Sequence, residues 1–364
     1  MAVEEAIWVL GCMSGTSMDG VDAAMLLSDG VEVFEFGATG FRPYGRAERD
    51  VIAAAQGRWP GEAGVAEAAR VVEDAHAELI ARFQGARLIG FHGQTLAHEP
   101  GGRGTHQAGD GARLARLTGL PVAWDFRSSD VAAGGQGAPL APFYHHALAR
   151  RAGMGPVAFL NLGGVGNVSF VNPLAGGPEM PGALLAFDTG PANAPMDDLV
   201  RARTGLACDY GGAMAAAGRV DGDVVARVLA DEHFSRKPPK SLDRNAFPDL
   251  LEAVSGLNDM DALATLAEVA ARAARLALDF APARPERVLV CGGGRKNDHL
   301  MARLKAVLPM PVAPVEEAGF DGDMLEAQAF AWLALRVRAG LPLSAPGTTG
   351  VGALIPGGRI SEAA

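Results

Sequence analysis

The chain has 364 residues, which is long enough for two domains with separate hydrophobic cores, and 49% hydrophobic with 20% charged residues is the composition of a soluble globular protein. A net charge of −10 argues against a surface for nucleic acid or anionic membrane. The three cysteines, Cys12, Cys208 and Cys291, are scattered and match no zinc-binding spacing, which is typical of a reducing compartment.

Targeting signals are not evident near the start of the sequence. Glu4 and Glu5 stand where a secretory signal would be positively charged, and the first basic residue is Arg42. No apolar run approaches the ~20 residues that span a bilayer. We therefore expect a cytoplasmic protein whose partners are neither nucleic acid nor membrane.

Residues 7–27 (IWVLGCMSGTSMDGVDAAMLL) predict a strand, a tight turn and a second strand that begins at Val21. The pair Asp19-Gly20 indicates a hairpin, since glycine accepts the positive φ of such turns. Hydroxyls and unobstructed backbone N–H groups in the turn could bind an anion. The stretch is neither a Walker loop nor a nucleophile elbow. A phosphate-binding turn and an ordinary surface hairpin both remain open, and three more glycine-rich turns downstream favour the first.

The remainder of the first half alternates strands and helices. Residues 31–39 alternate with period two and predict a third antiparallel strand, and residues 63–83 predict a helix with His76 on its buried stripe. Residues 88–91 predict a short buried strand, followed by a polar turn over residues 92–98. Because ligands of open α/β sheets bind beyond the carboxyl ends of strands, His92, Gln94 and Thr95 in this turn are candidates for contacts with a polyhydroxyl substrate.

A helix is expected over residues 109–118 and a strand over residues 122–126. Arg127 follows that strand and could clamp a carboxylate with two parallel hydrogen bonds. Residues 132–142 (AAGGQGAPLAP) have the composition of a hinge, so we set a domain boundary near Asp130.

The second half repeats this pattern. Residues 157–160 and 168–170 predict strands joined by a glycine-rich turn, and a strand over residues 184–187 is expected to end immediately before Asp188. A half-buried carboxylate there is placed like a general base, although a turn-capping aspartate is an equal alternative from sequence alone. Asp197 and Asp198 are expected to open the next helix, where their charge suits its dipole.

The last third contains two long helices and another glycine turn. A core helix is expected over residues 259–280, and residues 288–297 (VLVCGGGRKN) predict a strand and a turn leading to a helix near Asp298, where a backbone can approach a ligand closely. An amphipathic helix is expected over residues 323–338. Glu326 near its start could stabilise the helix dipole or reach a ligand. The final turns indicate a tail that folds back across a domain.

Taken together, these blocks resemble the anhydro-N-acetylmuramic acid kinase family, within the sugar kinase, Hsp70 and actin superfamily. The resemblance runs through nearly the whole chain and depends on the order and spacing of the blocks. They are residues 13–22 (MSGTSMDGVD), 92–95 (HGQT), 125–127 (DFR), 134–140 (GGQGAPL), 161–167 (NLGGVGN), 187–191 (FDTGP), 237–241 (KPPKS), 291–294 (CGGG) and 326–331 (EAQAFA).

The resemblance implies an α/β protein of two RNase H-like, actin-like ATPase domains with a central nucleotide cleft. The N-terminal domain would span residues 1–130, completed by the tail 350–364, and the C-terminal domain residues 131–349. The family reaction would open the 1,6-anhydro ring of anhydro-N-acetylmuramate with water while O6 takes the γ-phosphoryl group of ATP, as a step of peptidoglycan recycling. A homodimer is plausible for the family.

The site residues implied by the resemblance fall into four groups. Asp188 matches the catalytic base, although Ala192 stands four residues later where we expect glycine in the family. ATP would bind with Mg²⁺, and because the first turn lacks the leading Asp-x-Gly of most superfamily members, Asp19 and Asp22 are both candidate metal ligands. The residues implied for the nucleotide are Gly15, Thr16, Ser17, Met18, Asp19, Gly20, Val21, Asp22, Asn161, Gly163, Gly164, Asn167, Gly292, Gly293, Gly294 and Asn297. Those implied for the sugar are His92, Gln94, Thr95, Arg127 and Glu326.

Two other functions are weighed against this one. A kinase for another amino sugar could use the same scaffold without the hydrolytic water. An ATP-dependent switch of the Hsp70 or actin type would turn over ATP without making a phosphosugar.

Overall fold

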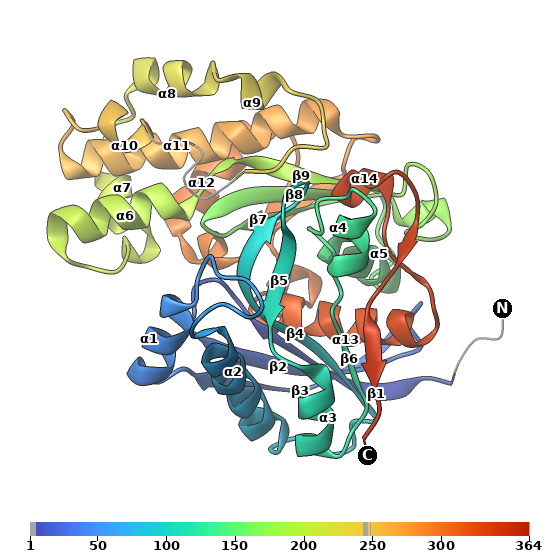
Figure 1. Cartoon of the computed structure of the whole chain (residues 1–364). Helices are drawn as coiled ribbons and strands as arrows, with labels where there is room; N and C mark the ends of the chain where they lie inside the picture. Colours follow the sequence, from blue (N-terminus) through green and yellow to red (C-terminus); the bar gives the residue numbers. More distant parts are fainter. Residues whose placement is uncertain (1–4, 243–246, 248, 364) are drawn as a thin grey trace. The chain divides into compact units, whose positions relative to one another are not determined.

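The computed structural model describes residues 5–242, 247 and 249–363 (Figure 1). The chain forms two compact units, Met1–Arg151 with Met324–Ala364 (unit 1) and Ala152–Asp323 (unit 2). Among the described residues, no helix is both long and apolar enough to cross a bilayer.

Unit 1 is built on a seven-stranded sheet in the order β14-β6-β4-β1-β2-β3, with β5 paired to β4. The strands β1, β2 and β3 form an antiparallel meander, whereas β4 runs parallel to β1 and β6 parallel to β4. The tail strand β14 pairs antiparallel with β6. The strands are β1 (Ile7–Ser14), β2 (Gly20–Ser28), β3 (Val33–Pro43), β4 (Leu88–Glu99), β5 (Gly104–Ala108), β6 (Val122–Trp124) and β14 (Arg359–Ser361), with a separate pair β12 (Pro342–Ser344) and β13 (Ile355–Pro356).

The helices of unit 1 cover both faces of this sheet (Figure 1). Leu10 and Cys12 of β1 point into a core shared with Val72 of α2, while Gly11 between them lies against α13, because side chains alternate along a strand. His76 is buried in the same core, as predicted. The helices are α1 (Arg46–Ala54), α2 (Val65–Ile80), α3 (Gly111–Thr118), α4 (Ser128–Ala132), α5 (Ala141–Arg151), α13 (Leu325–Arg338) and α14 (Pro346–Thr349).

Unit 2 repeats the plan with a five-stranded sheet in the order β11-β10-β7-β8-β9. Again the first three strands form an antiparallel meander and the last two run parallel to the first. The strands are β7 (Val157–Leu162), β8 (Val165–Val171), β9 (Leu184–Pro191), β10 (Arg287–Cys291) and β11 (Val312–Pro314). The helices are α6 (Asn193–Thr204), α7 (Ala213–Ala217), α8 (Gly222–Leu229), α9 (Glu232–Ser235), α10 (Leu250–Ala253), α11 (Asp259–Ala277) and α12 (Asp298–Val307), with short 3-10 turns η1 (Pro173–Ala175), η2 (Tyr210–Gly212), η3 (Leu278–Phe280), η4 (Gly293–Lys296) and η5 (Val315–Ala318).

Both units therefore share one strand order, in which a three-stranded meander is followed by two parallel strands. This repeat confirms the predicted fold class, an α/β protein of two RNase H-like domains. The two hairpins, the third strand, helix α2 and the strand–glycine–helix block at β10 and α12 were all predicted from sequence, whereas α1 was not. The stretch 132–142, expected to be a hinge, lies within unit 1, where buried Asp130 accepts hydrogen bonds from Gly137 N and Thr349 Oγ1 at 2.6 Å each.

Four local predictions were wrong. Residues 92–98 are not a turn, because β4 continues to Glu99 by pairing with β5, a strand that was not predicted. The strand β9 runs on to Pro191, so Asp188 lies within it. Helix α6 begins at Asn193, which places Asp197 and Asp198 beyond its first turn. Helix α13 is not amphipathic: it is buried on nearly all sides, since it packs on the sheet and on α5.

Close approach of α13 to the sheet depends on two paired glycines, Gly11 of β1 and Gly90 of β4. A Cβ on Gly11 would lie 1.9 Å from Ala327 O, and one on Gly90 would lie 2.1 Å from Phe330 O. Both obstacles are backbone atoms of α13, which cannot move aside as a flexible side chain would. These positions therefore require glycine for packing.

We expect Gly90→Ala to lower the free energy of unfolding by about 3 kcal/mol, because overpacking against backbone forces the helix away from the sheet. Urea denaturation followed by circular dichroism measures the change. Gly222→Ala is the matched control, since a Cβ there meets nothing within 4 Å. A Gly90→Ala protein as stable as the control would show that α13 is not held at this distance.

Candidate active site

The first glycine turn joins β1 to β2 and is held by its backbone. Met18 N and Gln94 Nε2 both donate to Gly15 O, at 3.0 and 3.1 Å, and Tyr44 N donates to Asp19 O at 2.9 Å. Met18 adopts a positive φ of 56°, which tightens the turn. Gln94 was predicted to lie on the sugar side; its buried amide supports this turn and also contacts Ser14 Oγ.

The residues of this turn do not all face outward. Thr16, Ser17 and Asp19 are exposed, and a Cβ on Gly15 would have no closer neighbour than Ser17 Oγ at 3.7 Å. Gly20 has a different reason to be glycine, because a Cβ there would lie 2.3 Å from Arg42 O. The side chain of Val21 is fully buried in the core. The part open to a ligand is thus residues 15–19.

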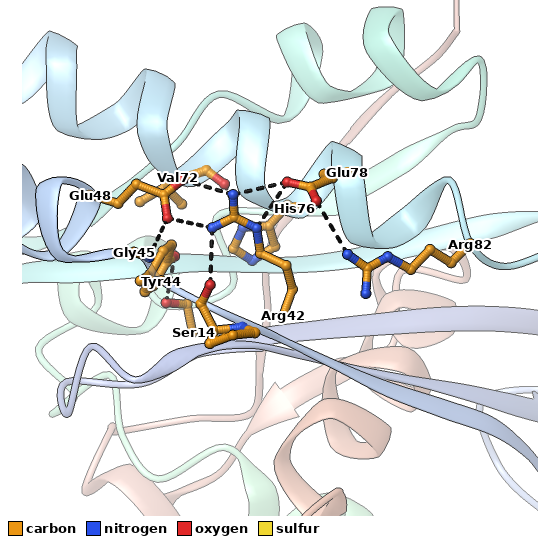
Figure 2. A network of polar contacts seen from close by, with 10 residues as sticks. Ser14, Arg42, Tyr44, Gly45, Glu48, Val72, His76, Glu78 and Arg82 are labelled. Atoms are coloured by element: carbon orange, nitrogen blue, oxygen red, sulfur yellow. Dashed lines mark hydrogen bonds and ion pairs between the residues drawn. The ribbon is translucent and has the colours of Figure 1, made fainter.

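A polar network fastens the turn to the neighbouring helices (Figure 2). Ser14 Oγ contacts Tyr44 Oη at 2.9 Å, and burial raises the pKa of Tyr44 to about 12, so this phenol stays neutral. Two residues before Tyr44, Arg42 binds Glu48 of α1 at 2.8 Å and Glu78 of α2 at 3.0 Å. Tyr44 and Arg42 were missed as supports of the turn, since neither belongs to a recognisable motif.

A second polar group in unit 1 brings together three residues predicted for the sugar. Arg127 Nε donates to His92 Nε2 at 3.0 Å, so His92 donates from Nδ1 to Gly93 O at 2.8 Å and is neutral. Burial, with the charge of Arg127, holds the pKa of His92 well below its usual range. Burial lowers the pKa of Arg127 to about 10 against the opposing charges of Glu326 and Asp130, so the guanidinium remains charged at neutral pH.

Glu326 has an exposed side chain at the start of α13, four residues before Phe330, whose ring lies 4.5 Å from that of His92. Arg127 also donates to Gly137 O at 2.8 Å, which fixes the guanidinium plane. Thr95, the remaining predicted sugar residue, accepts a hydrogen bond from Gln107 of β5 at 3.2 Å. Unit 1 thus gathers His92, Arg127 and Glu326, whereas Gln94 and Thr95 have other partners.

In unit 2, strand register aligns three predicted residues in one row. Asn161 of β7 pairs with Asn167 of β8, and Asn167 pairs with Asp188 of β9. Directly opposed residues point to the same face of a sheet with their Cβ atoms about 5 Å apart. All three are half-buried. The row therefore presents two carboxamides beside one carboxylate.

The other glycine turns of unit 2 pack around this row. A Cβ on Gly292 would lie 2.2 Å from Asn161 Oδ1, and one on Gly294 would lie 2.5 Å from the Leu162 side chain. Gly163 is open, since its nearest neighbour would be Val165 O at 3.7 Å. Asn297 Oδ1 accepts a hydrogen bond from Leu300 N at 2.9 Å, so this predicted nucleotide residue caps helix α12.

The turn over Gly163 and Gly164 rests on the start of α6. Asn193 N donates to Gly163 O at 2.9 Å and Ala192 N donates to Gly164 O at 3.2 Å. Ala192, which stands where the resemblance led us to expect glycine, has a φ of −130° and a ψ of −110°. This departure leaves the strand that carries Asp188 intact.

Asp188 is held through both its main chain and its carboxylate. Its N donates to Lys240 O at 3.1 Å, its carbonyl accepts from His233 Nε2 at 2.9 Å, and its Oδ2 accepts from Leu242 N at 2.7 Å. Burial raises the pKa of Asp188 to about 6, against the opposing hydrogen bond from Leu242. A carboxyl with this pKa can exchange a proton near neutral pH, as a general base requires.

Metal binding was predicted at Asp19 and Asp22. Asp19 is exposed at the first turn and Asp22 is half-buried on β2. Within the described part of the chain, no group of three or more His, Cys, Asp or Glu side chains could hold a metal ion. These single carboxylates fit an ion such as Mg²⁺, which is usually held by one or two carboxylates together with water and substrate phosphates.

Comparison with known proteins decides the family. Residues 7–361 match the family model for anhydro-N-acetylmuramic acid kinase. The chain belongs to the anhydro-N-acetylmuramic acid kinase family. A kinase of this name from Cereibacter sphaeroides is 64% identical over 359 residues, covering 98% of this chain and 96% of the relative. Kinases of the same name from Ruegeria sp. and Rhodospirillum rubrum are 56% and 50% identical, covering 97% and 99% of this chain and 94% and 95% of the relatives.

The anhydro-N-acetylmuramic acid kinase family match spans both units, so it includes the row at Asp188 and the group at Arg127. His233, Lys240 and Leu242, which contact Asp188 or one another, were not predicted as site residues. One signal could have drawn attention to them, because Lys237 and Lys240 are two of only four lysines in a chain with 32 basic residues.

Removing the charge of Asp188 should stabilise the protein above pH 6. The folded pKa of about 6 exceeds the ordinary value of 3.8, so ionisation costs folding free energy as the pH rises from about 4 to 6. We expect Asp188→Asn to raise the free energy of unfolding at pH 7 to 8 by up to about 3 kcal/mol, with the gain vanishing below about pH 4. Thermal unfolding across this pH range measures it, and a gain independent of pH would contradict the raised pKa.

Proposed function

We propose that this chain is an ATP-dependent kinase that converts 1,6-anhydro-N-acetylmuramate and water to N-acetylmuramate 6-phosphate and ADP. The observation that carries the proposal is the half-buried carboxylate of Asp188, with its raised pKa, in one row with Asn161 and Asn167. Family membership over residues 7–361 supports it. We also propose a cytoplasmic location, a role in peptidoglycan recycling and a homodimer on the basis of the family resemblance.

The chemistry balances with a single base. Asp188 takes one proton from water, the water oxygen bonds to C1, and the bond from C1 to O6 breaks. The freed O6 attacks the γ-phosphorus, and the bond from that phosphorus to the β,γ-bridging oxygen breaks to release ADP. Because O6 leaves carbon as it gains phosphorus, no nucleophilic side chain is needed, and positioning with charge neutralisation is sufficient.

Nucleotide binding is assigned to the two hairpin turns and the Gly292 turn. The open space at Gly15 and Gly163 would let phosphate oxygens approach backbone N–H groups, as in other anion-binding turns. The Gly292–Gly294 turn is proposed to lie near adenosine. Mg²⁺, held by Asp19 or Asp22 with the phosphates, would supply neutralisation of the charge on the transferred group.

Sugar binding is assigned to His92, Arg127 and Glu326. Arg127 is charged, fixed in its plane by Gly137 O, and fits the lactyl carboxylate of N-acetylmuramate. The neutral His92 also fixes the guanidinium, because its Nε2 accepts a hydrogen bond from Arg127 Nε. Thr95 and Gln94 are proposed to lie at the edge of the sugar site. Gln94 would act indirectly, because its amide holds the first turn at Gly15 O.

Asp188→Asn should abolish turnover, because an amide cannot take a proton from water, while ATP affinity stays within about twofold. Turnover by the wild type and the variant is measured by mass spectrometry of the product formed from anhydro-N-acetylmuramate and ATP in ¹⁸O water. The label is expected on the C1 hydroxyl, and product incubated in ¹⁸O water for the same time corrects for slow anomeric exchange. Loss of ATP affinity in the variant would reassign Asp188 to nucleotide binding.

The alternatives give different products. A general amino-sugar kinase would phosphorylate ring-opened N-acetylmuramate as well as the anhydro sugar. Phosphorylation of the ring-opened sugar needs no attacking water, so Asp188 would not be needed to take a proton from water. A switch of the Hsp70 or actin type would hydrolyse ATP and release phosphate without any phosphosugar. One assay with both sugars separates the three functions.

Gly15→Ala should weaken ATP binding by on the order of tenfold, because its methyl group would occupy space reserved for a phosphate. The protein itself tolerates that methyl group, since no atom outside the turn lies within 4 Å of it. Calorimetric titration with a non-hydrolysable ATP analogue measures the affinity. Gly256→Ala, which is equally free of contacts, is the control, and equal affinities for the two variants would rule out the phosphate contact.

A further inference from the structure

Lys240 has an unusual setting for a lysine. It is 8% exposed, and its ammonium donates to His233 O at 2.8 Å. The ammonium also lies 5.1 Å from the ring centre of Phe187 and 4.6 Å from that of Phe280. Burying a lysine ammonium costs folding free energy unless the group is paired, so the buried Lys240 ammonium calls for an explanation in terms of function.

The contacts of Lys240 form a closed ring with Asp188. The ammonium of Lys240 holds the carbonyl of His233, and His233 Nε2 donates to the carbonyl of Asp188 at 2.9 Å. The ring closes where Asp188 N donates to Lys240 O at 3.1 Å. Two residues after Lys240, Leu242 N donates to the Asp188 carboxylate at 2.7 Å. Three segments, β9, α9 and the loop after it, are thereby fixed relative to one another.

We infer that Lys240 is a positioning residue for the reaction: by anchoring residues 240–242, it aims the Asp188 carboxylate and keeps the Leu242 hydrogen bond on it. The inference rests on the proposed role of Asp188 as the base. It assigns to Lys240 no contact with substrate, and its effect passes through the main chain and through His233.

The ring also sets the basicity of Asp188. The hydrogen bond from Leu242 lowers the pKa of that carboxyl, opposing burial. If the loop shifts, this bond weakens and the pKa of Asp188 rises further. The charged groups that act on His233 are Lys240, which belongs to the ring, and Arg236 and Asp231, which lie outside it. Burial lowers the pKa of Lys240 to about 8, so it is charged at neutral pH.

The test compares Lys240→Met with Lys237→Met. Methionine keeps an unbranched chain against Phe187 and Phe280 but removes the ammonium. Lys237 is exposed, three residues earlier on the same loop, and serves as the matched control. For Lys240→Met we expect kcat to fall on the order of 10- to 100-fold, because small misplacement of a reacting group costs about that much. Affinity for the ATP analogue should stay within about twofold, and Lys237→Met should match the wild type.

The pH profile separates positioning from simple loss of structure. In the wild type the acidic limb of kcat/KM should lie at about 6, the pKa of Asp188. In Lys240→Met the limb should move to higher pH, while Lys240→Arg, which retains a cation and donors, should restore both the limb and most of kcat. Carboxyl ¹³C NMR, assigned with Asp188→Asn, should show the same rise in the pKa of Asp188 without relying on activity.

An unchanged limb and NMR pKa in a folded Lys240→Met protein would overturn the inference. If that variant does not fold, His233→Ala and His233→Gln test the same ring, since only glutamine retains a donor for the Asp188 carbonyl, and equal pH profiles for these two variants would also overturn it. A wild type that makes no phosphosugar from the anhydro sugar would instead refute the proposed function, while the NMR measurement would still decide the role of Lys240.

Discussion

Register between β7, β8 and β9 is the constraint on which the site in unit 2 depends. Residues opposed across antiparallel strands share a face of the sheet. Asn161 pairs with Asn167, and Asn167 pairs with Asp188, so backbone pairing alone places these three polar side chains together. A slip of one residue would turn each of these side chains to the other face. The meander that sets this register is also what the two units have in common.

The glycine-rich turns show that glycine serves two separate physical needs. Gly20 at the first hairpin and Gly292 after β10 are required by packing, because a Cβ would lie 2.3 Å from Arg42 O at the first position and 2.2 Å from Asn161 Oδ1 at the second. Gly15 and Gly163 have open space where the Cβ would be. Only the second kind is informative about a ligand, since the fold itself gives no reason for leaving that space empty. A motif read from sequence does not separate the two kinds.

The sequence predicted those features that depend on local pattern. Hairpins, the helix over α2 and the helix after Gly294 follow from periodicity and turn residues, and Asp188 was found from its place in a strand–turn block. The extension of β4 to Glu99 could not be predicted in this way, because it depends on pairing with β5. The use of Gln94 by the first turn and of Asn297 by α12 also escaped prediction, since hydrogen-bond partners are set by tertiary structure.

Asp188 and Lys240 show how two buried charged groups can be held in place without forming an ion pair with each other. Burial raises the pKa of the carboxyl and lowers that of the ammonium, and both shifts favour the neutral form. Both groups are still charged at neutral pH, so their ionisation costs folding free energy. Neither group is held by direct pairing with the other, and the ring through His233 instead joins them by main-chain hydrogen bonds. A direct ion pair would fix the carboxylate equally well but would lower its pKa and make it a poorer base. The ring holds the backbone of Asp188 and leaves its carboxyl basic, which resolves that conflict. It also explains why the ammonium of Lys240, in the loop that binds Asp188, acts on the carboxylate only through His233 and the main chain.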